Sequence, residues 1–261
     1  MYNKNTHAWS KMRAEAESAA LDEPILQPFL NEFIFKHAHF DDALINLLTY
    51  KLQCQQMDLL HLYSIIEEVL SNKSLIQSAL LDLAAVIDRD PANDCHLTPF
   101  LYFKGYQALQ AYRISHWLWQ HKRYQLAYYF QHRTSVIFGV DIHPAAQIGS
   151  SIMLDHATGI VVGETCVIGD NVSIMQAVTL GGTGKEHGDR HPKVEDEVLI
   201  SAGAKILGNI KLGKGCKVGA GSVVLQDVPA HTTVAGVPAI IVGRPKESKP
   251  ALSMNHEINF D

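Results

Sequence analysis

An aliphatic residue returns at every sixth position through the second half of the chain. The series is Ile142, Ile148, Leu154, Ile160, Cys166, Val172 and Val178, then, after an interruption, Val194, Ile200, Ile206, Leu212, Val218 and Val224. A period of six fits neither an amphipathic helix nor an alternating strand. It is typical of a parallel β-helix, in which short strands stack on equivalent strands of the next coil and bury a uniform inner column.

The first half of the chain lacks this repeat and has the features of helices. Thr98 followed by Pro99 is typical of a helix start, with the threonine as the cap and the proline in the first turn. With 261 residues and 47% hydrophobic content, the chain is long enough for two domains. We therefore predict an α+β protein with an α-helical domain over residues 1–138, a parallel β-helix over residues 139–245 and a flexible tail over residues 246–261.

Charge and cysteine usage exclude several classes of protein. The 22 Lys and Arg against 27 Asp and Glu give a net charge of −5 without a basic arm, which does not suggest nucleic-acid binding. No apolar run reaches the roughly 18 residues of a transmembrane helix. The four cysteines lie far apart without a CxxC pair, and no signal-like N-terminus precedes them. We expect a cytoplasmic protein with a small-molecule partner.

An acid and an imidazole, Asp155 and His156, stand where most other repeats carry small residues. Asp141 precedes His156 by a little under three repeats, so we expect its carboxylate on the coil below, where it could orient the imidazole and stabilise its protonated form. A histidine with a pKa of about 6.5 can take a proton from an alcohol and return it to a leaving group, which suits acyl transfer. The alternative is a structural histidine, and for His143 we favour that interpretation.

The interruption of the repeat predicts a protruding loop over residues 181–193. The register resumes at Val194, which is not a whole number of repeats after Val178, so the chain must leave the coil here. The glycine-rich start exposes backbone donors, and Arg190 offers a planar fork for a carboxylate. The alternative is a flexible surface excursion without a ligand.

Four lysines follow the loop without any acidic residue between positions 198 and 226. They are Lys205, Lys211, Lys214 and Lys217. A common positive face could meet the phosphates of a nucleotide-bearing cofactor. The alternative is a solvated face that binds nothing.

Six segments of the chain carry a resemblance to a known family. They are residues 140–146, 154–165, 178–185 and 188–193 in the repeat, and residues 88–92 and 103–113 in the helical half. They closely resemble serine O-acetyltransferase, a hexapeptide-repeat acyltransferase that commits serine to cysteine synthesis. The resemblance covers nearly the whole chain and implies a left-handed β-helix. It also implies homotrimers formed through the β-helices and commonly paired into hexamers, with active sites between neighbouring subunits.

The resemblance implies a role for each residue that matches the family. The implied catalytic residues are His156 as general base, Asp141 as its orienting carboxylate, and His191. The implied serine-binding residues are Asp90, Asp155, Arg190 and His191, with Arg190 on the substrate carboxylate. The implied acetyl-CoA contacts are Gly182, Thr183, Ala202, Ala220 and Lys217. No metal is implied, and L-cysteine is an expected feedback inhibitor.

The end of the chain departs from the family. Many members end in an isoleucine that inserts into the active site of O-acetylserine sulfhydrylase. Here Ile258 is followed by Asn259, Phe260 and Asp261, so it cannot offer its own carboxylate, and we do not expect the standard complex.

Three other functions remain open from the residues. A histidine-bound zinc, as in γ-class carbonic anhydrase, would draw on the ligand types at Asp141, His143, Asp155, His156 and His191. A noncatalytic assembly module is the second. The third is transfer to another acyl acceptor, such as homoserine or a sugar.

Overall fold

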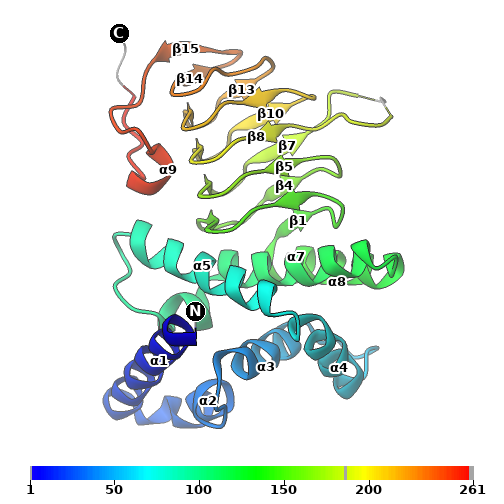
Figure 1. Ribbon diagram of the computed structural model, residues 1–261, viewed down its shortest axis with the longest axis vertical. Helices are drawn as coiled ribbons and strands as arrows, with labels where there is room; N and C mark the ends of the chain where they lie inside the picture. Colours follow the sequence, from blue (N-terminus) through cyan, green and yellow to red (C-terminus); the bar gives the residue numbers. More distant parts are fainter. Residues whose placement is uncertain (1, 185–186, 259–261) are drawn as a thin grey trace.

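The computed structural model describes residues 2–184 and 187–258, and it has a helical base beneath a tall parallel β-helix (Figure 1). The elements of the base are α1 (Tyr2–Asp22), η1 (Pro24–Leu26), α2 (Gln27–Leu30), η2 (Asn31–Phe35), α3 (Phe40–Leu52), α4 (Leu59–Leu70), α5 (Lys73–Arg89), α6 (Leu97–Tyr102), α7 (Lys104–Gln120) and α8 (Tyr124–Phe138). Helices α5, α7 and α8 lie across the lower end of the β-helix (Figure 1). The division at residue 138 stays a prediction, although α8 ends at Phe138 and β1 begins at Val140.

Helix α6 begins differently from the sequence prediction. Its first residue is Leu97, so Thr98 lies inside the helix and does not cap it. The carboxylate of Glu15, on α1, instead accepts hydrogen bonds from the backbone N–H groups of His96 and Leu97, both at 2.8 Å. The prediction was wrong because a side chain from a distant part of the chain supplies the cap.

The repeat folds as the predicted parallel β-helix. Its strands are β1 (Val140–Ile142), β2 (Gln147–Ile148), β3 (Met153–Leu154), β4 (Ile160–Val162), β5 (Val167–Ile168), β6 (Ser173–Ile174), β7 (Thr179–Gly181), β8 (Lys193–Val194), β9 (Leu199–Ile200), β10 (Lys205–Leu207), β11 (Lys211–Leu212), β12 (Lys217–Val218), β13 (Val223–Val224), β14 (Thr233–Gly236) and β15 (Ala239–Gly243). Over the described residues they form three sheets, ordered β1-β4-β7-β10-β13, β2-β5-β8-β11 and β3-β6-β9-β12-β14-β15. The closing pair, β14 and β15, is antiparallel.

The inner column changes phase between β3 and β4, which the sequence prediction missed. Ile142 pairs with Val162, and Val162 pairs in turn with Leu180. The first of these two steps is longer along the chain than the second, and the additional residues lie in the turn over residues 155–159, between β3 and β4. Four residues of the predicted series are therefore out of phase with Ile142, each lying two positions before the main column: Ile160, Cys166, Val172 and Val178.

These four residues are nevertheless buried, each at most 1% exposed. Their equivalents in the first coil, Val140, Ala146 and Ile152, are equally buried, so positions two places before the main column also face the interior. The predicted series is thus interior throughout, with Ile148 half-buried. Two interior positions in each repeat explain why the phase change left no gap in the apolar pattern.

The predicted loop leaves the coil between β7 and β8 and protrudes from the side of the β-helix (Figure 1). Leu180 pairs with Ile206, so this coil is much longer than the regular one that runs from Val162 to Leu180. Lys185, the last residue of the 178–185 segment that resembles the family, lies outside the described residues. The insertion and the earlier phase change together account for the irregular step between Val178 and Val194.

A buried ion pair joins the helical base to the lowest coil. The carboxylate of Asp82, on α5, is fully buried and accepts hydrogen bonds from the Arg113 Nη2 at 2.7 Å and the backbone N–H of Ile152 at 3.0 Å. Arg113, on α7, also donates to the carbonyl oxygen of Gly149 at 2.8 Å. These contacts fix the angle at which α5 and α7 meet the β-helix.

Replacing Asp82 with alanine should lower the free energy of unfolding by about 3–5 kcal/mol, because the change leaves a buried guanidinium without its carboxylate. Urea unfolding followed by circular dichroism would measure this loss. The matched control is Asp88→Ala on the exposed side of the same helix, for which we expect a change within about 0.5 kcal/mol. Equal effects of the two substitutions would contradict the role given to the ion pair.

Candidate active site

His156 lies in the turn that contains the additional residues of the first coil. His156 and Ala157 both have left-handed backbones, with φ of 52° and 58°. Two consecutive non-glycine residues in this region are costly, on the order of 1–3 kcal/mol each. The turn is held by short backbone hydrogen bonds from Ala157 N to Asp155 O (2.5 Å) and from Thr158 N to His156 O (2.7 Å). It projects the imidazole outward, where 73% of the side chain is exposed.

The first turn of α7 presses directly on this turn. A Cβ atom at Gly105 would lie 2.0 Å from the carbonyl oxygen of Leu154 and 3.1 Å from the Cβ of Ala157. The Nζ of the neighbouring Lys104 donates a hydrogen bond to the hydroxyl of Thr158. The helical base therefore supports the strained turn that carries His156, and only a residue without a side chain fits at position 105.

The predicted catalytic base shares one corner of the β-helix with two predicted acetyl-CoA contacts. Parallel pairing aligns Leu154, Ile174, Ile200 and Val218 in four successive coils. The residues two positions further on therefore stack on one another at the same corner: His156, Gln176, Ala202 and Ala220. We call this series the His156 corner. It lies between the six-stranded sheet of β3 and the five-stranded sheet of β1.

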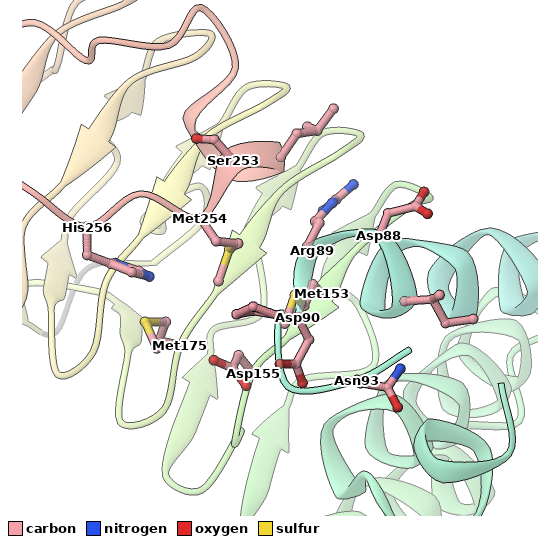
Figure 2. A pocket seen from close by; sticks show the side chains of 13 residues that line it. Asp88, Arg89, Asp90, Asn93, Met153, Asp155, Met175, Ser253, Met254 and His256 are labelled. Carbon is pink, nitrogen blue, oxygen red and sulfur yellow. The ribbon is translucent and has the colours of Figure 1, made fainter. Parts of the chain in front are cut away.

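A pocket of about 640 Å³ opens beside this corner (Figure 2). Asp90, which follows α5, and Asp155 both line it, so the structure brings together two predicted serine-binding residues from the two halves of the chain. Met153 and Met175 supply apolar wall from β3 and from the turn after β6. Asp88 lines the pocket as well, and three carboxylates suit a ligand with an ammonium group and a hydroxyl.

The tail supplies the opposite wall through Met254 and His256, which the sequence analysis missed (Figure 2). A short helix, α9 (Pro250–Ser253), docks first, where Ser173 Oγ donates to the carbonyl oxygen of Ala251 at 2.8 Å. His256 Nδ1 then lies 3.0 Å from Ser201 Oγ. No local signal in the sequence pairs these residues.

The four lysines do not form the common positive face that the sequence suggested. Lys205 lies on β10, Lys211 on β11 and Lys217 on β12, and these strands belong to three different sheets. A spacing of six carries each lysine to the next face of the β-helix, which is the physical reason for the error. The ammonium of Lys217 is buried beneath the tail and donates to the carbonyl oxygen of Glu257; burial lowers its pKa.

Arg190 and His191 lie at a different corner, between the five-stranded sheet and the four-stranded sheet of β2, which we call the His191 corner. Arg190 Nη2 donates to Glu164 Oε2 at 2.7 Å, and this hydrogen bond lowers the pKa of the Glu164 carboxyl group. His191 is buried, with 7% of the residue exposed. The loop start, with Gly182 half-buried and Thr183 exposed, lies at the same corner.

Asp141 is not bound to His156 in the described structure. It lies on β1 and accepts a hydrogen bond from Gln131 Nε2, on α8, at 2.7 Å. The carboxylate in reach of His156 is Asp155, whose Oδ1 is 3.9 Å from the imidazole Nε2. His143 packs its ring against Trp119 and Tyr128, with centroids 5.2 and 5.9 Å away, which agrees with the structural interpretation of this residue.

Comparisons with known proteins connect this geometry to a family. A family model described as "Serine acetyltransferase, N-terminal" matches residues 8–111, and one described as "Bacterial transferase hexapeptide (six repeats)" matches residues 191–226. The serine acetyltransferase of Escherichia coli K12 is 54% identical over 96% of this chain and 92% of its own length. The chain belongs to the serine acetyltransferase family.

Solved members of the serine acetyltransferase family share the whole fold. The crystal structure from Vibrio cholerae has a TM-score of 0.95 and 53% identity, covering 97% of this chain and 98% of that chain. A serine acetyltransferase complex with cysteine has a TM-score of 0.94 and 54% identity, covering 98% and 100%. A serine complex from Neisseria gonorrhoeae has a TM-score of 0.88 and 49% identity, covering 90% and 97%. The predicted family and fold are therefore confirmed.

Two further properties of this family member concern metals and membranes. Among residues 2–184 and 187–258, no three histidine, cysteine, aspartate or glutamate side chains are grouped in a way that could hold a metal ion. None of the described helices combines the length and the apolar character needed to cross a membrane.

Proposed function

We propose that this chain transfers the acetyl group of acetyl-CoA to the hydroxyl of L-serine, giving O-acetyl-L-serine and CoA. This reaction is the first step of cysteine biosynthesis from serine. The observation that carries the proposal is the His156 corner, where an exposed imidazole begins a series that continues through Ala202 and Ala220, beside a pocket lined by Asp90 and Asp155 among its acids. The relatives named serine acetyltransferase support the choice of acceptor.

His156 would act as the general base. Its Nε2 takes the proton of the serine hydroxyl while the oxygen attacks the thioester carbonyl, and a tetrahedral oxyanion forms. The intermediate collapses with cleavage of the carbon–sulfur bond, and the imidazolium returns its proton to the departing thiolate. In this proposal Asp90 and Asp155 hold the serine amino and hydroxyl end. The role of Asp141 as the carboxylate that orients the imidazole stays a prediction, because Asp141 binds Gln131 in the described structure. Gly182 and Thr183 contact acetyl-CoA with the two alanines. A contact from Lys217 would require the tail to move, because its ammonium is buried and donates to Glu257.

Direct transfer needs no covalent enzyme intermediate, because both substrates are held side by side. The buried cysteines agree with this mechanism. Burial raises the pKa values of Cys166 and Cys216 to about 12, so neither thiol is a ready nucleophile at neutral pH. All four cysteines, which fall within the described residues, are free thiols, and we place the protein in the cytoplasm on that basis.

The complete site would form between subunits. Arg190 and His191 occupy one corner of the chain and His156 another, with the five-stranded sheet between them. A homotrimer joined through the β-helices would bring the His191 corner of one subunit to the His156 corner of its neighbour, and pairing of the helical bases would give a hexamer. L-cysteine, whose amino and carboxylate groups match those of serine, would then compete at the same pocket.

Thiol release from acetyl-CoA tests the proposal. Purified protein is mixed with L-serine, L-homoserine, L-threonine or no acceptor, and a second series adds L-cysteine. We expect rapid release only with serine and suppression by cysteine. Release with another acceptor would keep the acyl transfer and replace the substrate, and no release with any acceptor would refute the proposed activity.

A further inference from the structure

A single threonine, Thr165, makes every hydrogen bond to the ring of His191 that the described part of the chain contains. The backbone N–H of Thr165 donates to His191 Nδ1 at 3.2 Å, and the Thr165 Oγ1 lies 2.9 Å from the same nitrogen. The same Oγ1 accepts hydrogen bonds from the backbone N–H groups of Arg190 and His191, both at 3.1 Å. Thr165 therefore fixes both the ring and the backbone that carries it.

The donor and acceptor count determines where the ring proton lies. A backbone N–H can only donate, so Nδ1 must be an acceptor and carries no proton. The hydroxyl of Thr165 uses both lone pairs on the two backbone N–H groups, which leaves its own proton for Nδ1 or for the carboxylate of Asp189, whose pKa is also lowered by a hydrogen bond from Thr165. In either case the hydroxyl requires no proton on Nδ1. A neutral imidazole without a proton on Nδ1 carries it on Nε2.

The surroundings of the ring agree with a neutral imidazole. Burial and then the charge of Arg190 lower the pKa of His191, so the ring stays neutral to lower pH than a free histidine does. The ring packs closely against Gly163, where a Cβ atom would be 2.1 Å from Cδ2 and 2.2 Å from Nε2. A Cβ at Gly182 would be 3.8 Å from the same Nε2. The ring itself fills the space beside Gly163, whereas the missing side chain at Gly182 leaves room near Nε2 for a substrate atom.

We propose that Thr165 is a positioning residue that fixes His191 as the Nε2–H tautomer, so that His191 serves the reaction as a neutral hydrogen-bond donor to a substrate oxygen. This role rests on the proposed function, because it requires the acyl acceptor or the thioester to lie at the His191 corner. It separates the two histidines of the site: His156 accepts the proton of the hydroxyl, and His191 does not exchange protons.

The tautomer can be read without any activity. Uniformly ¹⁵N-histidine-labelled full-length protein is studied by long-range ¹H–¹⁵N correlation between pH 6 and 8, and the His191 signals are assigned by their loss in His191→Gln. We expect a pyrrole-like Nε2 and a pyridine-like Nδ1 in the unliganded protein and with CoA present. A protonated Nδ1, or an imidazolium over this pH range, would overturn the proposal even if the enzyme is fully active.

Two variants of Thr165 test the positioning role. Thr165→Val keeps the shape but loses the hydroxyl, and we expect kcat/KM for serine to fall about tenfold because the backbone N–H groups of Arg190 and His191 lose their acceptor, while the backbone N–H of Thr165 still keeps Nδ1 free of a proton. Thr165→Ser keeps the hydroxyl and should stay within about twofold. Circular dichroism establishes that both variants fold. Equal losses in valine and serine variants would refute the role of the hydroxyl.

A second pair of variants separates a donor from a base at His191. Glutamine places an amide N–H near the position of Nε2, so His191→Gln should keep at least about tenfold more activity than His191→Ala. If His191 were a proton acceptor, both variants would be equally inactive. Absence of serine-dependent activity in the unmodified protein would refute the proposed function. The tautomer measurement would still test whether His191 carries its proton on Nε2.

Discussion

Replacing His156 with asparagine should lower the turnover number by about 10²–10⁴-fold, because the amide cannot take the proton of the acceptor hydroxyl. The loss should appear in kcat, while CoA binding measured by calorimetry stays within about twofold, since the proposed contacts to CoA do not include His156. Asparagine is the right replacement because it tolerates the left-handed backbone that position 156 requires, with φ of 52°. The fold should therefore survive the change.

The chain contains a matched control for this substitution. His231 is an exposed histidine in another turn and has the same φ of 52°. His231→Asn repeats the chemical change on an equivalent backbone far from the pocket, and we expect unchanged turnover and an unchanged melting temperature. Full activity of a folded His156→Asn protein would contradict the proposal that His156 is the general base.

Replacing Gly105 with alanine should destabilise the protein by about 1–3 kcal/mol and reduce turnover by at least tenfold. Helix propensity alone predicts the opposite sign, since alanine is better than glycine inside a helix by about 1 kcal/mol. The new Cβ would lie 2.0 Å from the carbonyl oxygen of Leu154, so α7 must move away from the turn that carries His156. Thermal unfolding and the thiol-release assay measure the two effects.

Gly184→Ala is the control for the stability effect. A Cβ at Gly184 has no atom within 4 Å, so the added methyl group meets open space. We expect no measurable loss of stability from this change. A stabilised Gly105→Ala protein with normal turnover would show that α7 does not support the His156 turn.

The β-helix could be predicted well from the sequence because every coil requires apolar residues of similar size at its interior positions. It did not predict the phase change, since Ile160 and Cys166 are buried at the alternative interior position and the apolar series continues without a break. The turn over residues 155–159 was nevertheless identified through its chemistry. An acid and an imidazole stood out against small residues there, even though the additional length of the turn was not recognised.

Contacts between distant segments were beyond the sequence. Three hydrogen bonds join residues that no local sequence pattern relates. They link Glu15 to the start of α6, Gln131 to Asp141, and His256 to Ser201. The prediction of a common positive face was wrong for a different reason. Lysines spaced six residues apart lie on different faces of a three-sided coil. The roles of the site residues remain predictions until the variants above are made.

The stacking of coils sets the distances between residues along the His156 corner. Successive coils are separated by about 4.8 Å, so the three steps from His156 to Ala220 cover about 14 Å. Each regular coil consists of three hexapeptide repeats, and removing one coil would shorten this distance by a single step without altering the shape of the interior. If acetyl-CoA runs along this corner as proposed, the distance from His156 to a contact on a later coil is a whole number of coil steps. In this architecture the number of coils between two contacts sets their spacing.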